Sequence, residues 1–386
     1  MVYLDNSATT QPFPEVVEAV RVAMLERWMN PSALYAPAVE VRRQFEDARR
    51  AAAGAMGASG GRVVLTGGGT DGDNLALIGA ANRYNQPGSL LISALEHPAV
   101  GESAAFLKLR GWEIMPLPAT PEGLVTPETV GQAADSAPVD RPVIVTCMQV
   151  NNETGARMDI EGIARAVKAA RPDALVHCDG VQGFLRTPLK LKNVDMYTVS
   201  AHKVHGPRGA GALFVRDGVV LRGVQAGGGQ EYGLRSGTED VAAALGFKAA
   251  LIRWQEEGAA WREELKKMKL YLLGQLLAIG DVRVNGPDPA GDFSAPHILN
   301  LSFEGVRAQV LLHALEQRQV YVSTGSACAS HGSRLSGTLK AMGVTGKRAE
   351  GAIRLSLSPL NTLGQMDEAA DAIKEMVLSL RQYRRR

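Results

Sequence analysis

Val143-Ile144-Val145-Thr146-Cys147-Met148 is a near-continuous apolar run, and a second one, Val176-His177-Cys178, follows it after an amphipathic stretch, Ile160–Ala170. Strands that are buried on both faces are apolar along their whole length, whereas strands with one hydrated face alternate. A helix between two such strands is typical of a parallel crossover. These residues therefore predict an α/β fold, with a mostly parallel central sheet covered by helices.

The same alternation extends in both directions, from about residue 60 to residue 215. Earlier in the chain it predicts strands at Val63–Leu65 and Leu90–Ser93, and helices at Asn74–Tyr84 and Val100–Leu109. Later it predicts strands at Met196–Val199 and Ala212–Val215. Strands that alternate with helices indicate a parallel sheet more strongly than any one segment does.

A second, smaller α/β domain is expected, because the 386 residues exceed the roughly 250–300 at which a single core stops growing. Val241 to about Leu277 has a mostly helical pattern, interrupted by a turn-like Glu257-Gly258. Beyond it we expect strands at Ile298–Phe303, Val320–Ser323 and Ile353–Ser356, and helices at Val310–Leu315 and Glu368–Leu380. The first dozen residues have no place in the central sheet and are expected to pack with the C-terminal part. We therefore expect a large domain at 14–255 and a small domain formed by 1–13 and 256–386.

The composition narrows the class of protein. A formal charge of +2 gives no electrostatic reason for nucleic acid or an anionic membrane to be the main partner. No apolar run approaches the about 20 residues of a membrane span, and Met1–Asp5 lacks the features of a signal peptide. Cys147, Cys178 and Cys328 are too few and too far apart for a disulfide framework. We expect a cytoplasmic protein that binds no metal, no membrane and no nucleic acid directly.

Lys203 follows a predicted strand and is surrounded by Ser200, His202, His205 and Gly206. In open α/β sheets, ligands bind beside the carboxyl ends of strands. A lysine in such a crevice loses its proton more easily and becomes a nucleophile toward carbonyl groups. On this segment alone, a surface lysine after a strand remains the alternative.

Two further segments carry groups that could bind a cofactor with a pyridine ring and a phosphate. Asp179 ends another strand, and a pyridine nitrogen that must stay protonated needs such a carboxylate, while Gln182 can reach the same ring. Gly67-Gly68-Gly69-Thr70 joins a strand to a helix, where backbone N–H groups favour a phosphate. The turn is neither a Walker A nor a dinucleotide motif. Alone, Asp179 also fits a helix N-cap or turn residue.

Together these segments resemble the class V aminotransferase group of fold-type I pyridoxal-phosphate enzymes, and within it the cysteine desulfurases of the NifS/IscS type. The resemblance covers nearly the whole chain. Its motifs are Tyr3–Thr10, Glu96-His97, Asn151–Gly155, Arg235–Thr238, Ser323–Cys328 and Ile353–Ser356. It implies pyridoxal 5'-phosphate as cofactor, L-cysteine as substrate, a homodimer, and transfer of sulfur to an acceptor protein such as an iron–sulfur scaffold or a tRNA thiolation enzyme.

The resemblance also implies roles for individual residues. Lys203 binds the cofactor covalently, His97 stacks on the ring and moves protons, and Asp179 and Gln182 meet the ring nitrogen and the phenolic oxygen. The phosphate is held by Gly69, Thr70, Ser200 and His202, with Thr238 supplied by the neighbouring subunit. Asn152 lies beside the cofactor and substrate, and Arg354 binds the substrate carboxylate. The family generally has Gly-Ala-Thr-Glu where this chain has Gly68-Gly69-Thr70-Asp71, so the turn and its surroundings are expected to differ.

Cys328 decides which reaction the resemblance implies. It lies in Ser323–Gly332, a run of small residues that predicts a mobile loop, and His331 nearby can favour the reactive thiolate. The implied reaction converts L-cysteine to L-alanine and leaves the sulfur as a persulfide on Cys328. Cys147 and Cys178 lie within apolar strands and are expected to be structural. An aminotransferase or selenocysteine lyase of the same fold is the alternative, and a catalytically silent scaffold is a more distant one.

Overall fold

The computed structural model describes residues 1–324 and 336–383, and its largest sheet has seven strands in the order β2-β8-β7-β6-β5-β3-β4. Strand β8 is antiparallel to both of its neighbours, and the other adjacent strands run parallel. The strands are β2 (Gly61–Thr66), β3 (Ser89–Ser93), β4 (Glu113–Leu117), β5 (Val143–Thr146), β6 (Leu175–Asp179), β7 (Met196–Ser200) and β8 (Gly211–Arg216). The predicted mostly parallel sheet is confirmed.

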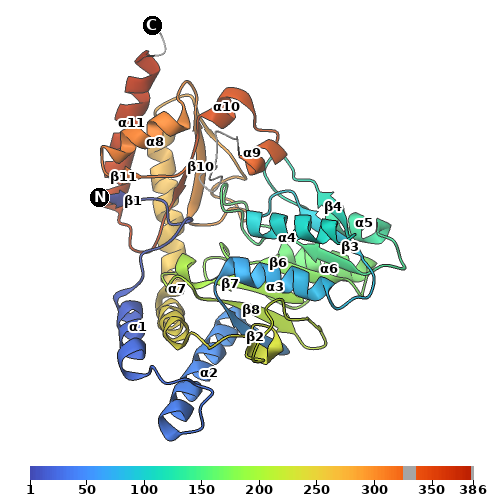
Figure 1. Ribbon diagram of the computed structural model, residues 1–386. Helices are drawn as coiled ribbons and strands as arrows, with labels where there is room; N and C mark the ends of the chain where they lie inside the picture. Colours follow the sequence, from blue (N-terminus) through green and yellow to red (C-terminus); the bar gives the residue numbers. More distant parts are fainter. Residues whose placement is uncertain (325–335, 384–386) are drawn as a thin grey trace.

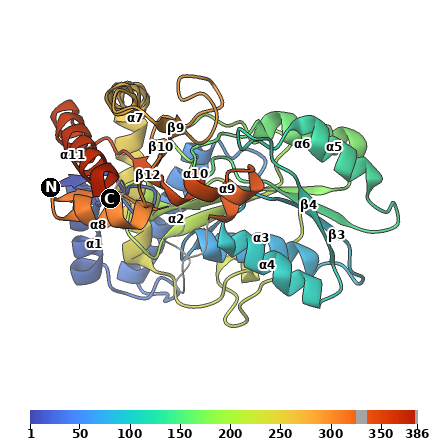
Figure 2. The ribbon, with the colours of Figure 1, turned by 90° about the horizontal axis from the view of Figure 1, so that it is seen from above.

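Helices cover both faces of this sheet, with α3 (Gly69–Ala81) and α4 (Pro98–Leu109) on one side and α5 (Pro127–Ser136) and α6 (Ile160–Ala170) on the other (Figure 2). Strand β3 is buried along its whole length. Its Leu90 and Ile92 pack with α3 and α4, while Leu91 packs with α5 and α6. Burial on both faces explains why these strands are apolar without alternation. Helices α1 (Pro14–Glu26) and α2 (Ala36–Met56) pack in the same hydrophobic core as Leu91.

Several of the helix predictions are wrong, among them the start of α11 (Leu363–Tyr383), which was expected at Glu368. Helix α3 begins at Gly69, not Asn74, so its first turn lies inside the glycine cluster. Helix α7 (Val241–Leu277) is continuous through Glu257-Gly258, which was expected to interrupt it. A Cβ at Gly258 would lie 3.0 Å from Trp254 Cε3, so the glycine leaves room for the indole ring. Packing along both halves of α7 outweighs the low helix propensity of one glycine.

Helix α7 runs from the lower to the upper part of the molecule in Figure 1 and ends among the C-terminal elements. There β9 (Val282–Val284), β10 (Ile298–Phe303) and β12 (Ala352–Ser356) form an antiparallel sheet. The surrounding helices are α8 (Ala308–Glu316), α9 (Gly337–Ala341), α10 (Gly346–Glu350) and α11 (Leu363–Tyr383). Leu265, Leu301, Leu311 and Ile373 are buried in one core of this region. In the described part of the chain, no helix combines the length and apolar character that crossing a membrane requires.

The N-terminal segment, residues 1–13, joins the two parts of the molecule. Strand β1 (Val2–Tyr3) pairs in parallel with β11 (Val320–Tyr321), which confirms the expected packing with the C-terminal part. The segment then crosses to the end of β7, where Thr10 N and Oγ1 both donate to the backbone oxygen of His202 at 2.9 Å. The N-terminal segment therefore contacts the C-terminal elements and the edge of the large sheet at which Lys203 lies.

Candidate active site

Lys203 lies directly after β7, in a short 3-10 helix, Ala201–Lys203. Its Nζ donates hydrogen bonds to the backbone oxygens of Ser7 at 2.6 Å and Ala8 at 2.8 Å. The buried guanidinium of Arg186 donates to the backbone oxygen of Lys203 itself. The lysine is thus placed at a strand end, as the sequence pattern predicts, with the N-terminal segment beside its amino group.

Asp179 is the last residue of β6, the strand next to β7, and its side chain is buried. The Val181 N–H donates to Asp179 Oδ1 at 2.9 Å. Burial raises the pKa of Asp179, whereas the Val181 N–H and the charges of His97 and Lys203 act to lower it. A buried carboxyl whose ionised form depends on positive neighbours suits a cationic partner such as a protonated ring nitrogen.

His97 caps the N-terminus of α4, and its Nδ1 accepts a hydrogen bond from Ala99 N at 3.1 Å. This acceptor role places the proton of the neutral imidazole on Nε2. Burial lowers the pKa of His97, and the charge of Lys203 lowers it further, against the opposing effect of Asp179. His97 is therefore neutral near pH 7 and has an Nε2–H donor.

The glycine turn between β2 and α3 faces the end of β7. Gly68 is the N-cap of α3 and has φ +138°, a conformation that favours glycine. A Cβ added at Gly68 would lie 3.7 Å from Ser200 Oγ, a buried atom that has no hydrogen-bond partner among the described residues. An unpartnered hydroxyl beside a helix N-terminus is suited to an anion. Thr70 follows in the first turn, with an exposed side chain.

Gly69 and Asp71 depart from the family pattern in this turn, and the structure shows a contact that accommodates each of them. A Cβ at Gly69 would lie 2.7 Å from Val181 Cγ2, so the glycine makes room for the valine that follows Asp179 in the sequence by two residues. The shorter Asp71 still reaches back to accept from Gly67 N at 2.6 Å, and Arg235 Nε also donates to it. The turn is thus held from both sides despite the two substitutions.

His202 and Gln182 contact the N-terminal segment and not one another. The His202 Nδ1 is 3.1 Å from Thr9 Oγ1. Burial lowers the pKa of His202 to about 4, and the positive charges of Lys203, Arg208 and Arg186 add to this shift. The Gln182 Nε2 donates to Ser7 O at 2.9 Å, and Arg186 Nη1 donates to Gln182 Oε1 at 3.3 Å. Arg186 was missed at the level of sequence, because an isolated arginine carries no motif that indicates burial.

Arg354 lies in β12, on the side of the site formed by the C-terminal elements, and is nearly buried. Its Nη1 donates to the backbone oxygen of Asn152 at 2.8 Å, and its Nη2 donates to Asp5 Oδ1 at 2.6 Å. The backbones of Arg354 and Ser323 exchange two hydrogen bonds, of 2.7 and 3.1 Å. The structure thus brings Arg354 and Asn152 together, as the resemblance implies, and adds Asp5, which it did not.

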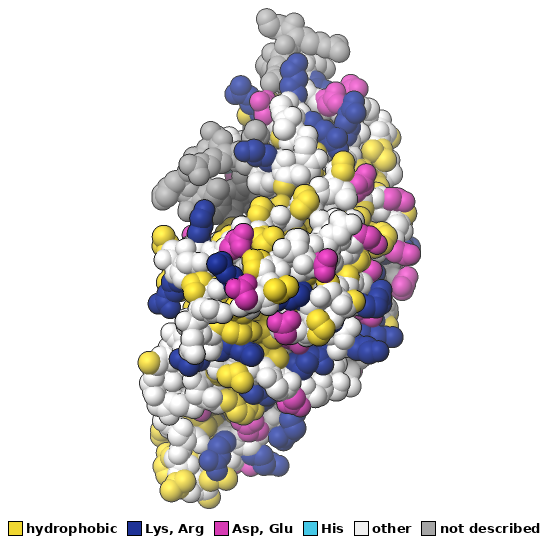
Figure 3. Space-filling model, turned by 90° about the vertical axis from the view of Figure 1, so that its right-hand side faces the viewer, with side chains coloured by type: hydrophobic (Ala, Val, Ile, Leu, Met, Phe, Trp, Pro, Cys, Tyr) yellow, Lys and Arg dark blue, Asp and Glu magenta, His cyan; other side chains and the backbone are white. Residues whose placement is uncertain are grey.

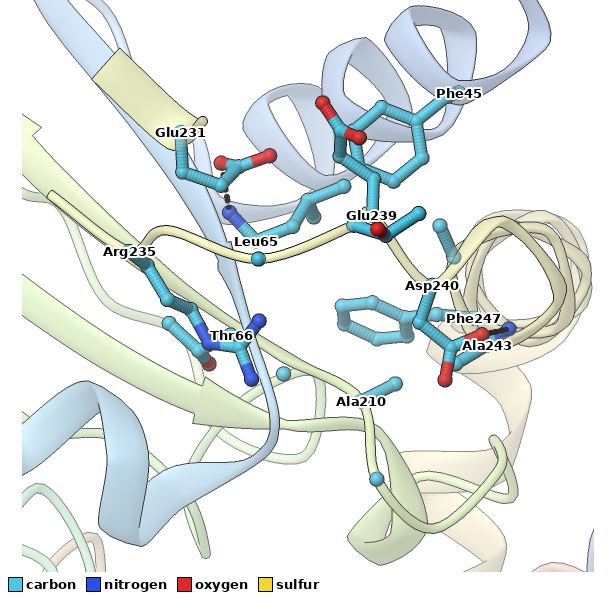
Figure 4. Close-up of a pocket in the computed structure, with 15 residues that line it drawn as sticks. Phe45, Leu65, Thr66, Ala210, Glu231, Arg235, Glu239, Asp240, Ala243 and Phe247 are labelled. Carbon is cyan, nitrogen blue, oxygen red and sulfur yellow. Dashed lines mark hydrogen bonds between the residues drawn. The ribbon is translucent and has the colours of Figure 1, made fainter. Parts of the chain in front are cut away.

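Among the described residues, Thr238 takes part in none of the contacts that join the other predicted site residues. It is exposed, and it lines a cavity of about 160 Å³ together with Thr66, Glu231 and Arg235. Figure 4 shows this cavity, in which Glu231 accepts a hydrogen bond from Leu65 N at 2.8 Å. Arg49 Nη2, outside the cavity, also donates to Glu231, at 2.8 Å. These bonds tie the segment that carries Thr238 to β2 and α2.

Two of the three cysteines lie in the part of the chain that the structure describes. Cys328 and the neighbouring His331 lie outside the described residues. Cys147 and Cys178 are both buried, and burial raises the pKa of each thiol well above its usual value. A buried thiol with a raised pKa is a poor nucleophile, which fits the structural role expected of both. Cys178 lies in β6 as predicted, whereas Cys147 directly follows β5.

Comparison with known proteins identifies the family to which this chain belongs. The sequence profile of the family "Aminotransferase class-V" matches residues 2–368. The chain belongs to the class-V aminotransferase family. A NifS/IcsS protein homolog of Lactobacillus delbrueckii subsp. bulgaricus is 36% identical over 384 residues, which cover 97% of each chain. A protein named cysteine desulfurase IscS from Clostridium botulinum is 34% identical over 387 residues, covering 99% of this chain and 95% of the relative. A solved NifS-like protein superposes with a TM-score of 0.89 at 32% identity, over 98% and 99% of the two chains.

Class-V aminotransferase enzymes are pyridoxal-phosphate-dependent proteins of fold type I, and the residues of this chain fit the cofactor. The buried, unpartnered Ser200 Oγ lies beside the glycine turn, where a phosphate would satisfy it. The buried Asp179 lies on the adjacent strand, with Lys203 close enough to influence its pKa. A phosphate site, a carboxylate and a lysine at neighbouring strand ends are the groups that this cofactor requires.

Proposed function

We propose that this chain is a pyridoxal-phosphate-dependent cysteine desulfurase, which takes sulfur from L-cysteine, releases L-alanine and carries the sulfur as a persulfide on Cys328. The observation that carries the proposal is the set of buried groups at the ends of β6 and β7, in a chain whose full-length relatives include a cysteine desulfurase. Cys328 itself lies outside the described residues, and its role rests on the family resemblance.

The groups around Lys203 divide the work of holding the cofactor. Lys203 would bind it covalently, Asp179 would pair with the ring nitrogen, Gln182 would meet the phenolic oxygen, and His97 would lie against the ring. Gly69, Thr70, Ser200 and His202 would hold the phosphate. The bound cofactor supplies an electron sink that stabilises negative charge at the substrate Cα.

Two residues are suited to move protons. Lys203 Nζ would be the base that takes the Cα proton of the substrate. His97 presents an Nε2–H, because its Nδ1 accepts from Ala99 N. Its lowered pKa keeps the ring neutral, so the Nε2 proton is available for hydrogen bonding without a full positive charge beside Lys203.

The substrate would be oriented by its carboxylate. Arg354 offers a planar guanidinium whose Nε is buried and has no partner among the described residues, and Asn152 lies beside it. Binding there would hold L-cysteine in place while its side-chain sulfur reacts. The Cys328 thiolate would form a bond to that sulfur as the bond from sulfur to Cβ breaks, which leaves a persulfide on the enzyme.

A homodimer is part of the proposal, because Thr238 reaches no other predicted cofactor-binding residue within its own chain. Large apolar side chains are exposed close to it, among them Trp28 at 73% and Met24 at 65%. These two residues line the same groove of about 530 Å³ as Thr238. Exposed apolar surface of this kind is typical of an interface between subunits, so a second copy would bring Thr238 to the neighbouring phosphate.

We also propose that the persulfide serves an acceptor protein, such as an iron–sulfur scaffold or a tRNA thiolation enzyme, in the cytoplasm. On the face shown in Figure 3, acidic and basic side chains are interspersed, which suits protein contacts better than a polyanion. The proposed domains, 14–255 and 1–13 with 256–386, are supported by a core built from Val2, Leu4 and C-terminal residues. Phe13 and residues between 339 and 352 instead pack in the core of the large domain.

The test uses Cys328→Ala in the purified holoenzyme. We expect the variant to bind the cofactor and L-cysteine like the wild type but to form no persulfide, and to release sulfide at less than about one hundredth of the wild-type rate. Cys147→Ala is the matched control, since that thiol is buried, and it should keep full turnover. Full sulfide release by Cys328→Ala would refute the assignment.

The same assay separates the alternative enzymes. An aminotransferase needs a 2-oxo acid to sustain turnover, whereas a desulfurase forms alanine from cysteine without one. A selenocysteine lyase would act on selenocysteine and leave cysteine unchanged. Alanine and persulfide formed in equal amounts from L-cysteine alone therefore support the proposed reaction over both.

A further inference from the structure

The guanidinium of Arg354 is already held at two of its nitrogens. Nη2 donates to Asp5 Oδ1 at 2.6 Å and Nη1 donates to the backbone oxygen of Asn152 at 2.8 Å, while the buried Nε has no partner among the described residues. The Arg354 side chain is 6% exposed and that of Asp5 is 22% exposed. A guanidinium is planar and rigid, so fixing two of its nitrogens also fixes the direction of the third.

Asp5 is itself firmly placed. Leu4 N donates to Tyr321 O at 2.8 Å on one side of it, and Asn6 Nδ2 donates to Ser356 O at 2.8 Å on the other. Asp5 also forms an isolated β-bridge with Ser356 in β12, the strand that carries Arg354. The carboxylate is thus anchored through its backbone to the same strand as the arginine that it contacts.

We propose that Asp5 is a positioning residue for Arg354, which holds the guanidinium plane in the orientation that meets the α-carboxylate of the substrate. This inference rests on the proposed function, because it requires an amino-acid substrate. Without Asp5, Nη2 would lose its acceptor, and the side chain would be free to turn about its own bonds and seek another. The carboxylate of the substrate would then meet a guanidinium that has no fixed direction.

A purely structural role for the ion pair is the competing explanation. Asp5 lies in the N-terminal segment, and the Asp5–Arg354 contact joins residues 349 positions apart. If the contact only fastened this segment, its loss would affect every ligand of the site alike, because Ser7 O and Ala8 O of the segment also contact Lys203. A positioning role predicts a loss confined to ligands that carry a carboxylate.

The experiment compares wild-type holoenzyme with Asp5→Ala and Asp5→Asn, using L-cysteine as substrate. We expect Asp5→Ala to raise KM about tenfold with kcat within about twofold. Asparagine keeps an oxygen acceptor at the same place, so Asp5→Asn should raise KM by no more than about threefold. If the wild type forms no persulfide or alanine from L-cysteine, the proposed function fails; if it does and the KM values of both variants equal that of the wild type, this inference fails.

Competition by L-alanine and by ethylamine isolates the carboxylate, because ethylamine is L-alanine without that group. We expect Asp5→Ala to weaken inhibition by L-alanine about tenfold and to leave inhibition by ethylamine unchanged. An equal loss for both ligands would overturn the inference in favour of the structural role. If Asp5→Ala does not yield folded holoenzyme, Asp5→Asn carries the test, with a threefold loss expected for L-alanine alone.

Discussion

The carboxyl ends of β6 and β7 and the N-terminal segment both reach Lys203, but different physical rules place them there. Asp179 and Ser200 end neighbouring parallel strands, so the topology of the sheet brings them to one edge. Asp5 and Ser7 reach the site through contacts with residues up to 349 positions away. The strand ends can be placed from local sequence patterns, whereas the N-terminal segment is placed only by the folded chain.

Among the predictions, the largest effect is expected at the strand ends, for substitution of Asp179. Asparagine has nearly the same shape as aspartate but carries no charge, so Asp179→Asn should leave the ring nitrogen of the cofactor without an anionic partner. We expect kcat to fall roughly a thousandfold, equivalent to about 4 kcal/mol of barrier. Steady-state kinetics, together with the absorption of the bound cofactor, measure the effect.

Asp73 provides the matched control, since it is a second buried carboxyl, in α3. Burial raises the pKa of Asp73 well above its usual value, and the nearby Asp179 adds to this shift. This shift favours the uncharged form of the carboxyl, which asparagine resembles, so Asp73→Asn should change kcat by less than about fivefold. A comparable loss in the two variants would mean that packing, and not the charge of Asp179, explains the result.

The large sheet was predictable because buried strands and amphipathic helices leave direct marks on the sequence. β3, β5, β6 and β10 were expected within two residues of their observed ends, and α6 was expected at its observed bounds. Lys203, Asp179 and the glycine turn were singled out from their positions at strand ends before any family was named. Their roles remain predictions, which the substitutions at Asp179 and Cys328 test.

The N-terminal segment makes the second prediction, through His205. The His205 Nδ1 donates to Gln11 O at 2.7 Å, its ring stacks on Phe13 at 4.4 Å, and its Nε2 is buried without a partner among the described residues. Burial lowers the pKa of His205 from 6.5 to about 4. The unfolded state thus binds the proton more tightly, so stability is lost as pH falls from about 6.5 towards 4, on the order of 3 kcal/mol in full.

His205→Asn should remove this dependence, and asparagine tolerates the φ of +65° at this position. We expect the free energy of unfolding of the variant to vary less between pH 6.5 and 4 than that of the wild type, as measured by denaturant titration at several pH values. Phe13→Leu removes the ring stacking but keeps the imidazole, so it should lower stability and retain the pH dependence. Parallel curves for the wild type and His205→Asn would contradict the assignment.

The contacts that were not predicted share one physical feature, which is that they join segments far apart in the chain through polar groups. Arg186 is buried, yet nothing in its neighbouring residues indicates that its guanidinium meets the backbone of Lys203. Asp5 was part of a quoted motif, but its pairing with Arg354 depends on how the N-terminal segment crosses the molecule. The interruption expected at Gly258 failed for a different and local reason, since Trp254, four residues earlier in α7, fills the space beside that glycine.

The smallest predicted effect lies in the glycine turn, where a local departure from the family pattern has a neighbour that explains it. In Gly69→Ala, the new Cβ would lie 2.7 Å from Val181 Cγ2, closer than real contacts allow. Valine is stiff about its first side-chain torsion, so the turn must move away from Val181 and thereby shift relative to Ser200. We expect the affinity of the apoenzyme for pyridoxal phosphate to fall about tenfold, or about 1.4 kcal/mol, as measured by equilibrium titration.

Val181→Ala supplies the other half of a double-mutant cycle. Alone it removes two methyl groups beside Gly69, and it should change the cofactor affinity by less than about threefold. Combined with Gly69→Ala, it removes the atom that the new Cβ would meet, so the double variant should regain most of the lost affinity. Such non-additivity is expected only of residues in contact. If the two effects simply add, the contact with Val181 does not explain the role of Gly69. Gly69 would then matter, like Gly68, for the backbone conformation that glycine allows.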